Sequence, residues 1–421
     1  MRRRLFAAVS VLVALVPVTW TSPATADMAH PSVVSANPVD FTPHVLDGTV
    51  WALALVGDTV VVGGSFTKVA DSSRKQTYAR KNVFAYGLKD GAVRAFAPAV
   101  DAPVYALAAG ASSTVYLGGS FKTVNGAAQR GLARVSVTDG QRISTFGGRI
   151  NWGDVRALDV SGSQLYAGGT FSAVNGVARA GLARMNPVTG AVDTGFDARL
   201  SAPGLSRTRV EHFDISPDST RLVAIGALLK SGSTDRTQLA MFDVSGATAA
   251  LTSWYTDAYK PECMKGFDTY LRQVKFSPDG RYFVVAATGR ASSSTKLCDS
   301  AARFETAGTG RHDPTWVQRT GGDSLYAVAV TGAAVYVGGH ERYLDNPYGS
   351  DAKGPGPGAV SRVGIGAVSP TTGKALAWNP TRTRGVGVRA FLVTSGGLIV
   401  GSDTDQLGHE YHGRIGMFPL S

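Results

Sequence analysis

The sequence has little charge, little cysteine and no long apolar run beyond its first residues. Only 17% of the 421 residues are charged, whereas about a quarter is usual in soluble proteins. After the N-terminal stretch, no apolar segment approaches the roughly 18 to 20 residues that a membrane-spanning helix needs, so we expect no membrane span in the mature chain. The 51 glycines follow no Gly-X-Y period, which excludes collagen. With 44% hydrophobic residues, the chain is not a disordered one either.

Motifs for the common catalytic and cofactor chemistries are also missing. The sequence has no G-x-S-x-G nucleophile motif, no phosphate-binding loop, no dinucleotide fingerprint and no CxxC pair. Its net charge of +11 is spread along the chain without a dense basic run after the first residues, so we expect no nucleic-acid partner. The sequence alone assigns no catalytic residue and no cofactor.

The N-terminus has the features of a secretory signal peptide. The basic residues Arg2–Arg4 precede an apolar stretch, Leu5–Trp20, and Ala24-Thr25-Ala26 matches an A-x-A cleavage site. We predict that residues 1–26 are a signal peptide and that the mature protein is extracellular.

The two cysteines bear on the same question of compartment. In an oxidising compartment two thiols of one chain usually pair, so we predict a disulfide between Cys263 and Cys298.

A repeat with an offset of 50 residues organises the chain. Val115–Arg134 matches Leu165–Arg184 closely, and each copy contains a Gly-Gly pair and follows a Val-x-Ala-Leu sequence. Weaker copies cover Val50–Phe66, Leu325–Gly339 and Val388–Ser402, and two diverged units with Pro-Asp turns lie between them. Each of these seven units predicts four short strands, and four-stranded sheets repeated in this way are typical of a β-propeller.

The two ends of the chain complement each other. Arg414–Ser421 matches a third strand, so the seventh unit lacks its fourth, and Pro38–Pro43 resembles the fourth-strand segment Arg94–Pro98. We therefore expect an all-β fold: a seven-bladed β-propeller closed by an N-terminal strand that completes the last blade. Residues 27–421 would then form a single domain.

The repeated unit Gly-Gly-Ser/Thr-Phe-x-x-Val-Asn-Gly resembles the delta-60 repeat propellers of secreted bacterial proteins, most clearly at 115–146 and 165–196. The C-terminal part, Gly338–Pro347, Gly385–Val388 and Gly401–Thr404, looks like a group of exported actinobacterial propellers. The resemblance implies a propeller fold and export, and it implies no activity. The Gly-Gly pair is also similar to that of kelch repeats, but the Tyr and Trp that should follow are absent.

Long loops predict a functional face. In a propeller, the loops between strands two and three share one face with the loops that join blades, and several of them are long here. Polar side chains that could bind a sugar or an ion, or perform acid–base chemistry, gather in the loops of the sixth and seventh units, although such residues can equally be solvated loop residues. The candidate ligand-binding residues are His340, Glu341, Arg342, Tyr343, Asn346, Asp403, Asp405, His409, Glu410 and His412.

No metal site is assigned among these candidates. Asp403 and Asp405 could hold calcium through their oxygens, but one short pair falls far below a calcium-loop signature. His409 and His412 lack the i, i+4 helical spacing of a zinc motif.

These observations leave more than one function open. The first is a secreted, monomeric, non-catalytic binding module that takes an extracellular or cell-wall glycan, or a protein, through its long-loop face. The alternative is a polysaccharide hydrolase or lyase with an acidic and histidine site on the same face, for which paired carboxylates would be needed. A third function is a scaffold that holds partners around its rim.

Overall fold

The computed structural model describes residues 28–264, 266–290, 293, 295–348 and 354–420. The predicted signal peptide, residues 1–26, lies outside the described residues. Within them the regular secondary structure is strand, as the sequence predicts. No helix with the length and hydrophobicity of a membrane span is found in this part of the chain.

Seven larger antiparallel sheets follow one another along the described chain, and we number them one to seven. Sheets four and five have four strands, and the other five have three. The strands, sheet by sheet, are β2 (Thr49–Val56), β3 (Thr59–Ser65) and β6 (Val83–Gly87); β7 (Val104–Gly110), β8 (Thr114–Gly119) and β11 (Leu132–Ser136); β12 (Val155–Ser161), β13 (Gln164–Gly169) and β16 (Leu182–Met185); β18 (Arg209–Ile215), β19 (Arg221–Ala227), β22 (Leu239–Asp243) and β23 (Ala250–Leu251); β24 (Leu271–Phe276), β25 (Tyr282–Ala287), β26 (Ser300–Glu305) and β27 (Trp316–Arg319); β28 (Leu325–Val330), β29 (Val335–Gly339) and β32 (Ile365–Val368); β33 (Ala390–Thr394), β34 (Gly397–Gly401) and β37 (Ile415–Pro419).

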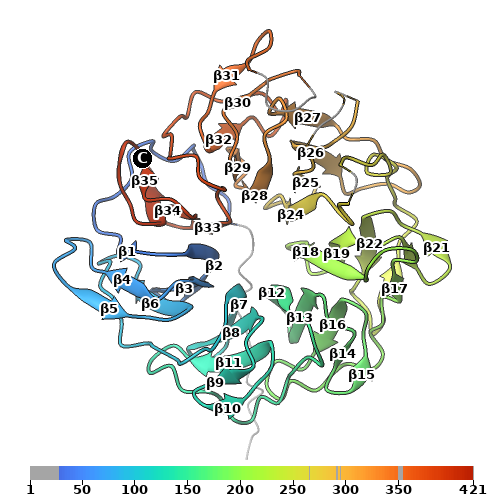
Figure 1. Ribbon diagram of the computed structural model, residues 1–421. Helices are drawn as coiled ribbons and strands as arrows, with labels where there is room; N and C mark the ends of the chain where they lie inside the picture. The colour runs from blue at the N-terminus through green and yellow to red at the C-terminus, as the bar shows by residue number, and fades with distance from the viewer. Residues whose placement is uncertain (1–27, 265, 291–292, 294, 349–353, 421) are drawn as a thin grey trace, which may run out of the picture.

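The predicted fourth strand is shorter than expected in several units. In sheets one, two, three and six only an isolated bridge stands in its place, such as that between Tyr86 and Val93. The turns between second and third strands carry small sheets, which lie at the periphery in Figure 1. Two of these small sheets also include a strand from the segment that precedes a first strand. Their strands are β1 (His44–Val45), β4 (Lys68–Ala70) and β5 (Thr77–Ala79); β9 (Thr123–Val124) and β10 (Ala127–Ala128); β14 (Ala173–Val174) and β15 (Val177–Ala178); β17 (Leu200–Ser201), β20 (Lys230–Ser231) and β21 (Thr234–Asp235); β30 (Tyr343–Leu344) and β31 (Val360–Ser361); β35 (Gln406–Leu407) and β36 (Glu410–Tyr411).

The larger sheets stand around a common centre with their first strands innermost (Figure 1). Each first strand contacts the first strands of the preceding and following sheets, and β33 of the last sheet contacts β2 of the first. The first strands therefore line the axis of the molecule, and the small sheets form its outer edge.

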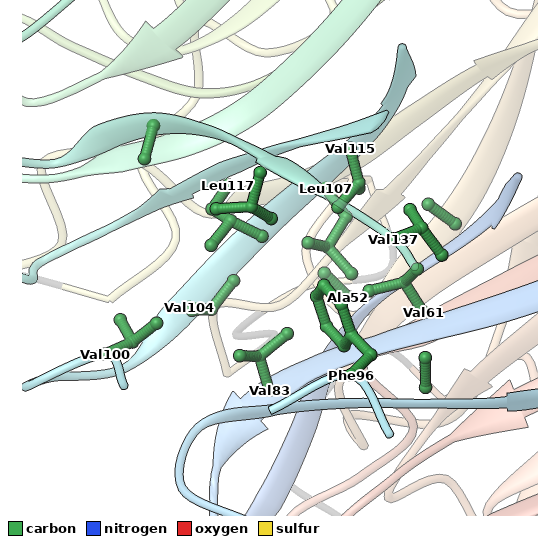
Figure 2. Packing of buried hydrophobic residues seen from close by; sticks show 14 of the residues in the cluster. Ala52, Val61, Val83, Phe96, Val100, Val104, Leu107, Val115, Leu117 and Val137 are labelled. Atoms are coloured by element: carbon green, nitrogen blue, oxygen red, sulfur yellow. The ribbon is translucent and has the colours of Figure 1, made fainter. Parts of the chain in front are cut away.

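Apolar side chains fill the space between neighbouring sheets. Between sheets one and two, Val61, Val83 and Phe96 pack against Val104 and Leu117 (Figure 2). A similar cluster joins sheets seven and one. Because each sheet buries both faces against its neighbours, its middle strand is a continuous buried run rather than an alternating one, as the burial of every residue of β8 shows.

The first glycine of each Gly-Gly pair allows this close packing. A Cβ atom on Gly118 of β8 would lie 2.7 Å from Cγ1 of Val155 in the next sheet, so only glycine leaves room for that valine. The same contact recurs between Gly63 and Val104, Gly168 and Val210, and Gly338 and Val388. In the last sheet Gly401, which is followed by a serine, makes it with Val50.

The second glycine faces the start of the first strand of its own sheet. A Cβ atom on Gly119 would collide with the backbone oxygen of Pro103. At this point β7 has a β-bulge, a register shift between Val104 and Ala106. The glycine lets the two backbones approach where the bulge places an extra residue in the first strand.

The segment before β1 runs beside the last strand of sheet seven. The amide of Val39 donates to the carbonyl of Met417 at 2.9 Å, and the amide of Ser35 donates to that of Pro419 at 2.8 Å. The first bond corresponds to that from Arg94 to Ala85 in sheet one, which agrees with the sequence resemblance between the two segments.

Cys263 and Cys298 form a disulfide with their Cα atoms 5.8 Å apart, as the sequence predicts. The bond joins the segment that enters sheet five to the connection between the second and third strands of that sheet. It therefore connects two loops of the same sheet.

The packing of the glycines makes a direct prediction. We expect Gly118→Val to lower the free energy of unfolding by about 1–3 kcal/mol or more, because the buried site has no room for the added methyl groups. Gly246→Val is the control, since nothing lies within 4 Å of a Cβ atom there. Urea denaturation measures both, and equal stabilities of the two variants would contradict the packing argument.

Candidate functional site

A cavity of about 430 Å³ occupies the centre of the molecule. The first strands of all seven larger sheets contribute to its lining. Many of the lining residues are alanines, among them Ala52, Ala106 and Ala157, which leave the space open. The volume is within the usual range for a small-ligand site, roughly 300–1,000 Å³.

One side chain from each larger sheet is directed to the same end of this cavity. In six first strands it is the extra residue of a β-bulge, like Trp51 between Val50 and Ala52. In the seventh sheet Arg389 lies at the equivalent position, directly before Ala390. We call these residues the bulge ring. All of them are half-buried and line the cavity: Trp51, Tyr105, Arg156, Glu211, Arg272, Tyr326 and Arg389.

Neighbouring side chains of the bulge ring contact each other through aromatic and charged groups. The rings of Trp51 and Tyr105 meet edge to face at 5.8 Å. The guanidinium of Arg389 lies 4.0 Å from the ring centre of Tyr326 and 4.8 Å from that of Trp51. On the other side, Arg156 lies 5.7 Å from the ring centre of Tyr105. The ring is thus preorganised by cation–π and aromatic contacts.

Positive charge exceeds negative charge in the bulge ring, which holds three arginines and one glutamate. Glu211 is shared between Arg156 at 3.4 Å and Arg209 at 2.9 Å, and Arg156 also pairs with Asp154 at 3.0 Å. Burial alone would lower the pKa of Arg156, but Glu211 and Asp154 outweigh it and raise that pKa.

A second group of charges lies deeper in the cavity wall. Nζ of Lys275 is 2.6 Å from Oδ1 of Asp214, whose Oδ2 accepts a hydrogen bond from the amide of Phe276 at 2.7 Å. Burial raises the pKa of the neighbouring Asp159 to about 6, and burial lowers the pKa of His212 to about 3, so this imidazole is neutral. Among the described residues, no group of three or more His, Cys, Asp or Glu side chains has the arrangement of a metal site.

The ten residues proposed from the sequence do not line the cavity, but two of them lie beside the bulge ring. The imidazole of His340 is 5.7 Å from the ring of Tyr326, and its Nδ1 bonds to the carbonyl of Val386 at 3.2 Å. Asp403 accepts hydrogen bonds from the amides of Val386 and Gly387 at 2.6 and 3.0 Å. Both side chains therefore hold the segment that leads to Arg389.

Three more of the proposed residues support loops of sheet six. Arg342 pairs with the buried Asp323 at 2.9 Å, and its guanidinium lies 5.7 Å from the ring centre of Tyr343. The side-chain amide of Asn346 donates to Gly354 at 2.9 Å and accepts from Gly356 at 3.1 Å, which shapes the loop between β30 and β31.

Glu341 has an unusual environment. Its side chain is fully buried, and neither carboxylate oxygen has a hydrogen-bond partner among the described residues. Burial raises its pKa to about 8, although the charge of Arg382 acts against this shift. Such a carboxyl is held neutral inside the protein and is not accessible to a ligand.

The remaining proposed residues lie in or near the hairpin of β35 and β36, away from the bulge ring. Asp405 and His409 are exposed, and Glu410 is half-buried. His412 is buried, with its Nδ1 3.3 Å from Oγ1 of Thr42, and burial lowers its pKa. The structure therefore does not bring the ten candidates together in one place.

Comparisons with known proteins place this fold among the β-propellers. A family described as "Domain of unknown function (DUF5122) beta-propeller" matches residues 164–196, which is part of one repeat. The WD40 β-propeller domain of Doa1 superposes with a TM-score of 0.52 at 11% identity, over 91% of this chain and 97% of that one. The designed Ika8 protein gives 0.48 at 13% identity, over 92% of this chain and 100% of that one. Hydrazine synthase of Kuenenia stuttgartiensis gives 0.42 at 15% identity, over 71% and 76%. No curated relative matches the sequence.

The chain is thus similar to proteins of the β-propeller class, which fits the all-β architecture. The family match bears no assigned activity, and the likeness to the Doa1 domain shows the fold alone. The site must therefore be interpreted from its own chemistry.

The buried Glu341 carboxyl predicts a pH dependence of stability. The folded protein holds a proton up to about pH 8 that the unfolded chain releases near its ordinary pKa of 4.5, so stability falls as the pH rises between these values. We expect Glu341→Gln, which stays neutral, to reduce this loss by more than about 1.4 kcal/mol, the equivalent of one pKa unit.

Urea denaturation at about pH 5 and about pH 8 measures this effect. Glu410→Gln, in the hairpin of β35 and β36, is the control and should keep the wild-type profile. Identical pH profiles of wild type and Glu341→Gln would contradict the assignment of a neutral carboxyl.

Proposed function

We propose that this protein is an exported, non-catalytic binding module that takes its ligand at the bulge ring, on the face of the long loops. The observation that carries the proposal is the convergence of one cavity-lining residue from each larger sheet at one end of the central cavity. A site assembled from every sheet of a rigid scaffold is well suited to hold a ligand in one orientation.

The architecture in this proposal is a seven-bladed propeller closed by the N-terminal segment, with residues 27–421 as one domain. Three observations support it. Each first strand contacts the next in order, and β33 contacts β2. Gly401 packs against Val50 as each earlier glycine packs against the following sheet. The amide of Val39 bonds to Met417 in the position of a fourth strand.

Export is supported by the sequence of residues 1–26 and by the disulfide, which forms and persists in oxidising compartments. We expect a monomer that acts outside the cell on a glycan or a protein. A bacterial, and specifically actinobacterial, origin remains the prediction of the sequence resemblance.

A binding role is favoured over hydrolysis or lysis of a polysaccharide by the state of two carboxylates that the sequence proposes for this face, Asp403 and Glu341. The alternative enzyme would need an acidic and histidine site on the same face. Asp403 is paired with Arg382 at 2.9 Å and bonds the backbone, and Glu341 is buried away from the cavity. Neither is free to act as a general acid or base on a ligand in the bulge ring.

Binding at the bulge ring makes a first prediction. A panel of immobilised glycans identifies a ligand, and we expect Tyr105→Ala to weaken its binding roughly fivefold or more, as for an interface residue worth above 1 kcal/mol. Tyr78→Ala, in β5 at the outer edge, is the matched control and should bind like the wild type. Release of shortened glycan products, or full binding by Tyr105→Ala, would refute the proposal.

Closure makes a second prediction. A chain that begins at His44 lacks the segment beside β37, and we compare it with a chain that begins at Asp27. We expect the shorter chain to lose more than about 2 kcal/mol of stability, because Val39 and Phe41 no longer pack between sheets seven and one. We also expect it to self-associate through the uncovered edge of β37. Chemical denaturation and gel filtration measure both effects, and unchanged stability with a monomeric profile would count against closure.

A further inference from the structure

Arg389 forms no ion pair with a carboxylate among the described residues, unlike Arg156 in the same ring. Its guanidinium lies between the rings of Tyr326 and Trp51, at 4.0 and 4.8 Å from their centres. Among the described residues it has no carboxylate within ion-pair distance, and its Nε has no hydrogen-bond partner. By contrast, Arg156 and Arg382 each pair with an aspartate. Arg389 therefore presents to the cavity a guanidinium that forms no ion pair, although the charges of Asp403 and Glu211 act on it.

Arg272 is a second cation of the same ring for which no ion pair is found among the described residues. It donates to the carbonyls of Thr269 and Leu271, at 3.3 and 3.0 Å, and no carboxylate lies within ion-pair distance among the residues described. Burial lowers the pKa of Arg272; the charge of Glu211 acts against this shift, and the charges of Arg209 and Arg389 add to it. Two partly desolvated guanidinium groups that form no ion pair favour the binding of an anion beside them.

The remaining side chains of the site indicate what kind of molecule carries this anion. Trp51, Tyr105 and Tyr326 offer aromatic rings on which the C–H face of a pyranose packs, and their polar edges remain in contact with water. Glu211 offers a carboxylate that accepts from hydroxyl groups. Gln273, whose carbonyl accepts from the amide of Val328 at 2.7 Å, keeps its amino group for donation.

The shape of the site favours a chain of small units over a folded partner. The cavity of about 430 Å³ admits a small ligand or the end of a polymer. Exposed apolar side chains stand in the segments that enter first strands, at the same end as the bulge ring. Trp152 is 39% exposed, Phe267 39% and Val386 53%. They offer contacts for further units that extend out of the cavity.

We infer that Arg389 and Arg272 bind the carboxylate of an acidic saccharide, so that a uronic-acid unit occupies the bulge ring. The planar guanidinium groups match a carboxylate through paired N–H donors. This inference rests on the proposed binding function and adds the charge and chemical class of the ligand.

The test is calorimetric titration of the mature protein with three probes of similar length. They are a trimer of a hexuronic acid, the neutral hexose trimer of the same linkage, and an acidic tripeptide with a free carboxyl terminus. We expect the uronic trimer to bind roughly tenfold or more tightly than the neutral one, with an affinity that falls as salt is added. Arg389→Gln should abolish that preference.

Arg281→Gln is the matched control, because Arg281 is exposed in the turn between β24 and β25, at the other end of the first strands from the bulge ring. It should bind the uronic trimer like the wild type. A thermal-unfolding measurement accompanies the titrations: the trimer should raise the unfolding midpoint of the wild type and of Arg281→Gln, but not that of Arg389→Gln. The unfolding transition of each variant without ligand also shows whether that variant is folded.

The outcomes separate this inference from the proposed function. Equal binding of the acidic and neutral trimers, lost together in Tyr105→Ala, overturns the acidic saccharide and leaves the binding module in place. Binding of the tripeptide alone overturns it in favour of a peptide carboxylate. If none of the three probes binds, the inference of an acidic saccharide is overturned as well, while the glycan panel still tests the proposed binding function.

Discussion

The architecture depends on the close approach of backbones at the Gly-Gly pairs. The first glycine leaves room for the valine of the next sheet, as Gly118 does for Val155. The second lets the strand approach a β-bulge in its own sheet, as Gly119 does at the start of β7. In sheets one, two, three and six this dipeptide thus sets both the spacing to the next sheet and the approach of the second strand to the bulge in the first. Because protein interiors are close-packed, neither position tolerates a side chain without displacement of a neighbour.

The same constraint creates the candidate site. A bulge inserts one residue into a strand and re-aims its side chain, so each first strand can present a residue to the central cavity without disturbing the core on either side. The chemistry of that residue varies, from Trp51 to Glu211 to Arg389, while the residue directly before it is a buried valine or leucine in every larger sheet. The scaffold and the site are therefore separable in the sequence, although they are adjacent in space.

Electrostatics distinguish the parts of the site that are already satisfied from those that are not. Asp323 pairs with Arg342 and Arg384, and Asp403 holds Arg382 and two backbone amides, which fixes the loops around the sixth and seventh sheets. These charges are neutralised by ion pairs and hydrogen bonds within the protein. Arg389 and Arg272 form no ion pair among the described residues, and in the proposed site they bind the carboxylate of the ligand. Several of the polar loop residues that the sequence singles out thus fix the loops beside the bulge ring, and the bulge ring itself consists of other residues.

The all-β fold was predictable because each repeat carries its whole structural unit. The Gly-Gly pair, the Val-x-Ala-Leu sequence and the turn glycines lie close together along the chain, and local patterns of this kind are visible without any long-range contact. The disulfide between Cys263 and Cys298 was predictable from their number and from the expected compartment. For the site, the sequence indicated the long-loop face, but it pointed to residues such as His409 and His412 that lie apart from the bulge ring.

The sequence by itself determined the repeat, the strand pattern and the residue types available in each unit, since these follow from local propensity and spacing. The x of Val-x-Ala-Leu was visible as a variable position, and it was the one signal that could have located the ring. Only the tertiary structure decided that these seven positions meet, because residues such as Trp51 and Arg389 are far apart in the chain. Strand alternation cannot show where such a residue points, because the bulge interrupts the alternation at that position. Only the arrangement of the sheets around one axis brings the seven side chains to one cavity.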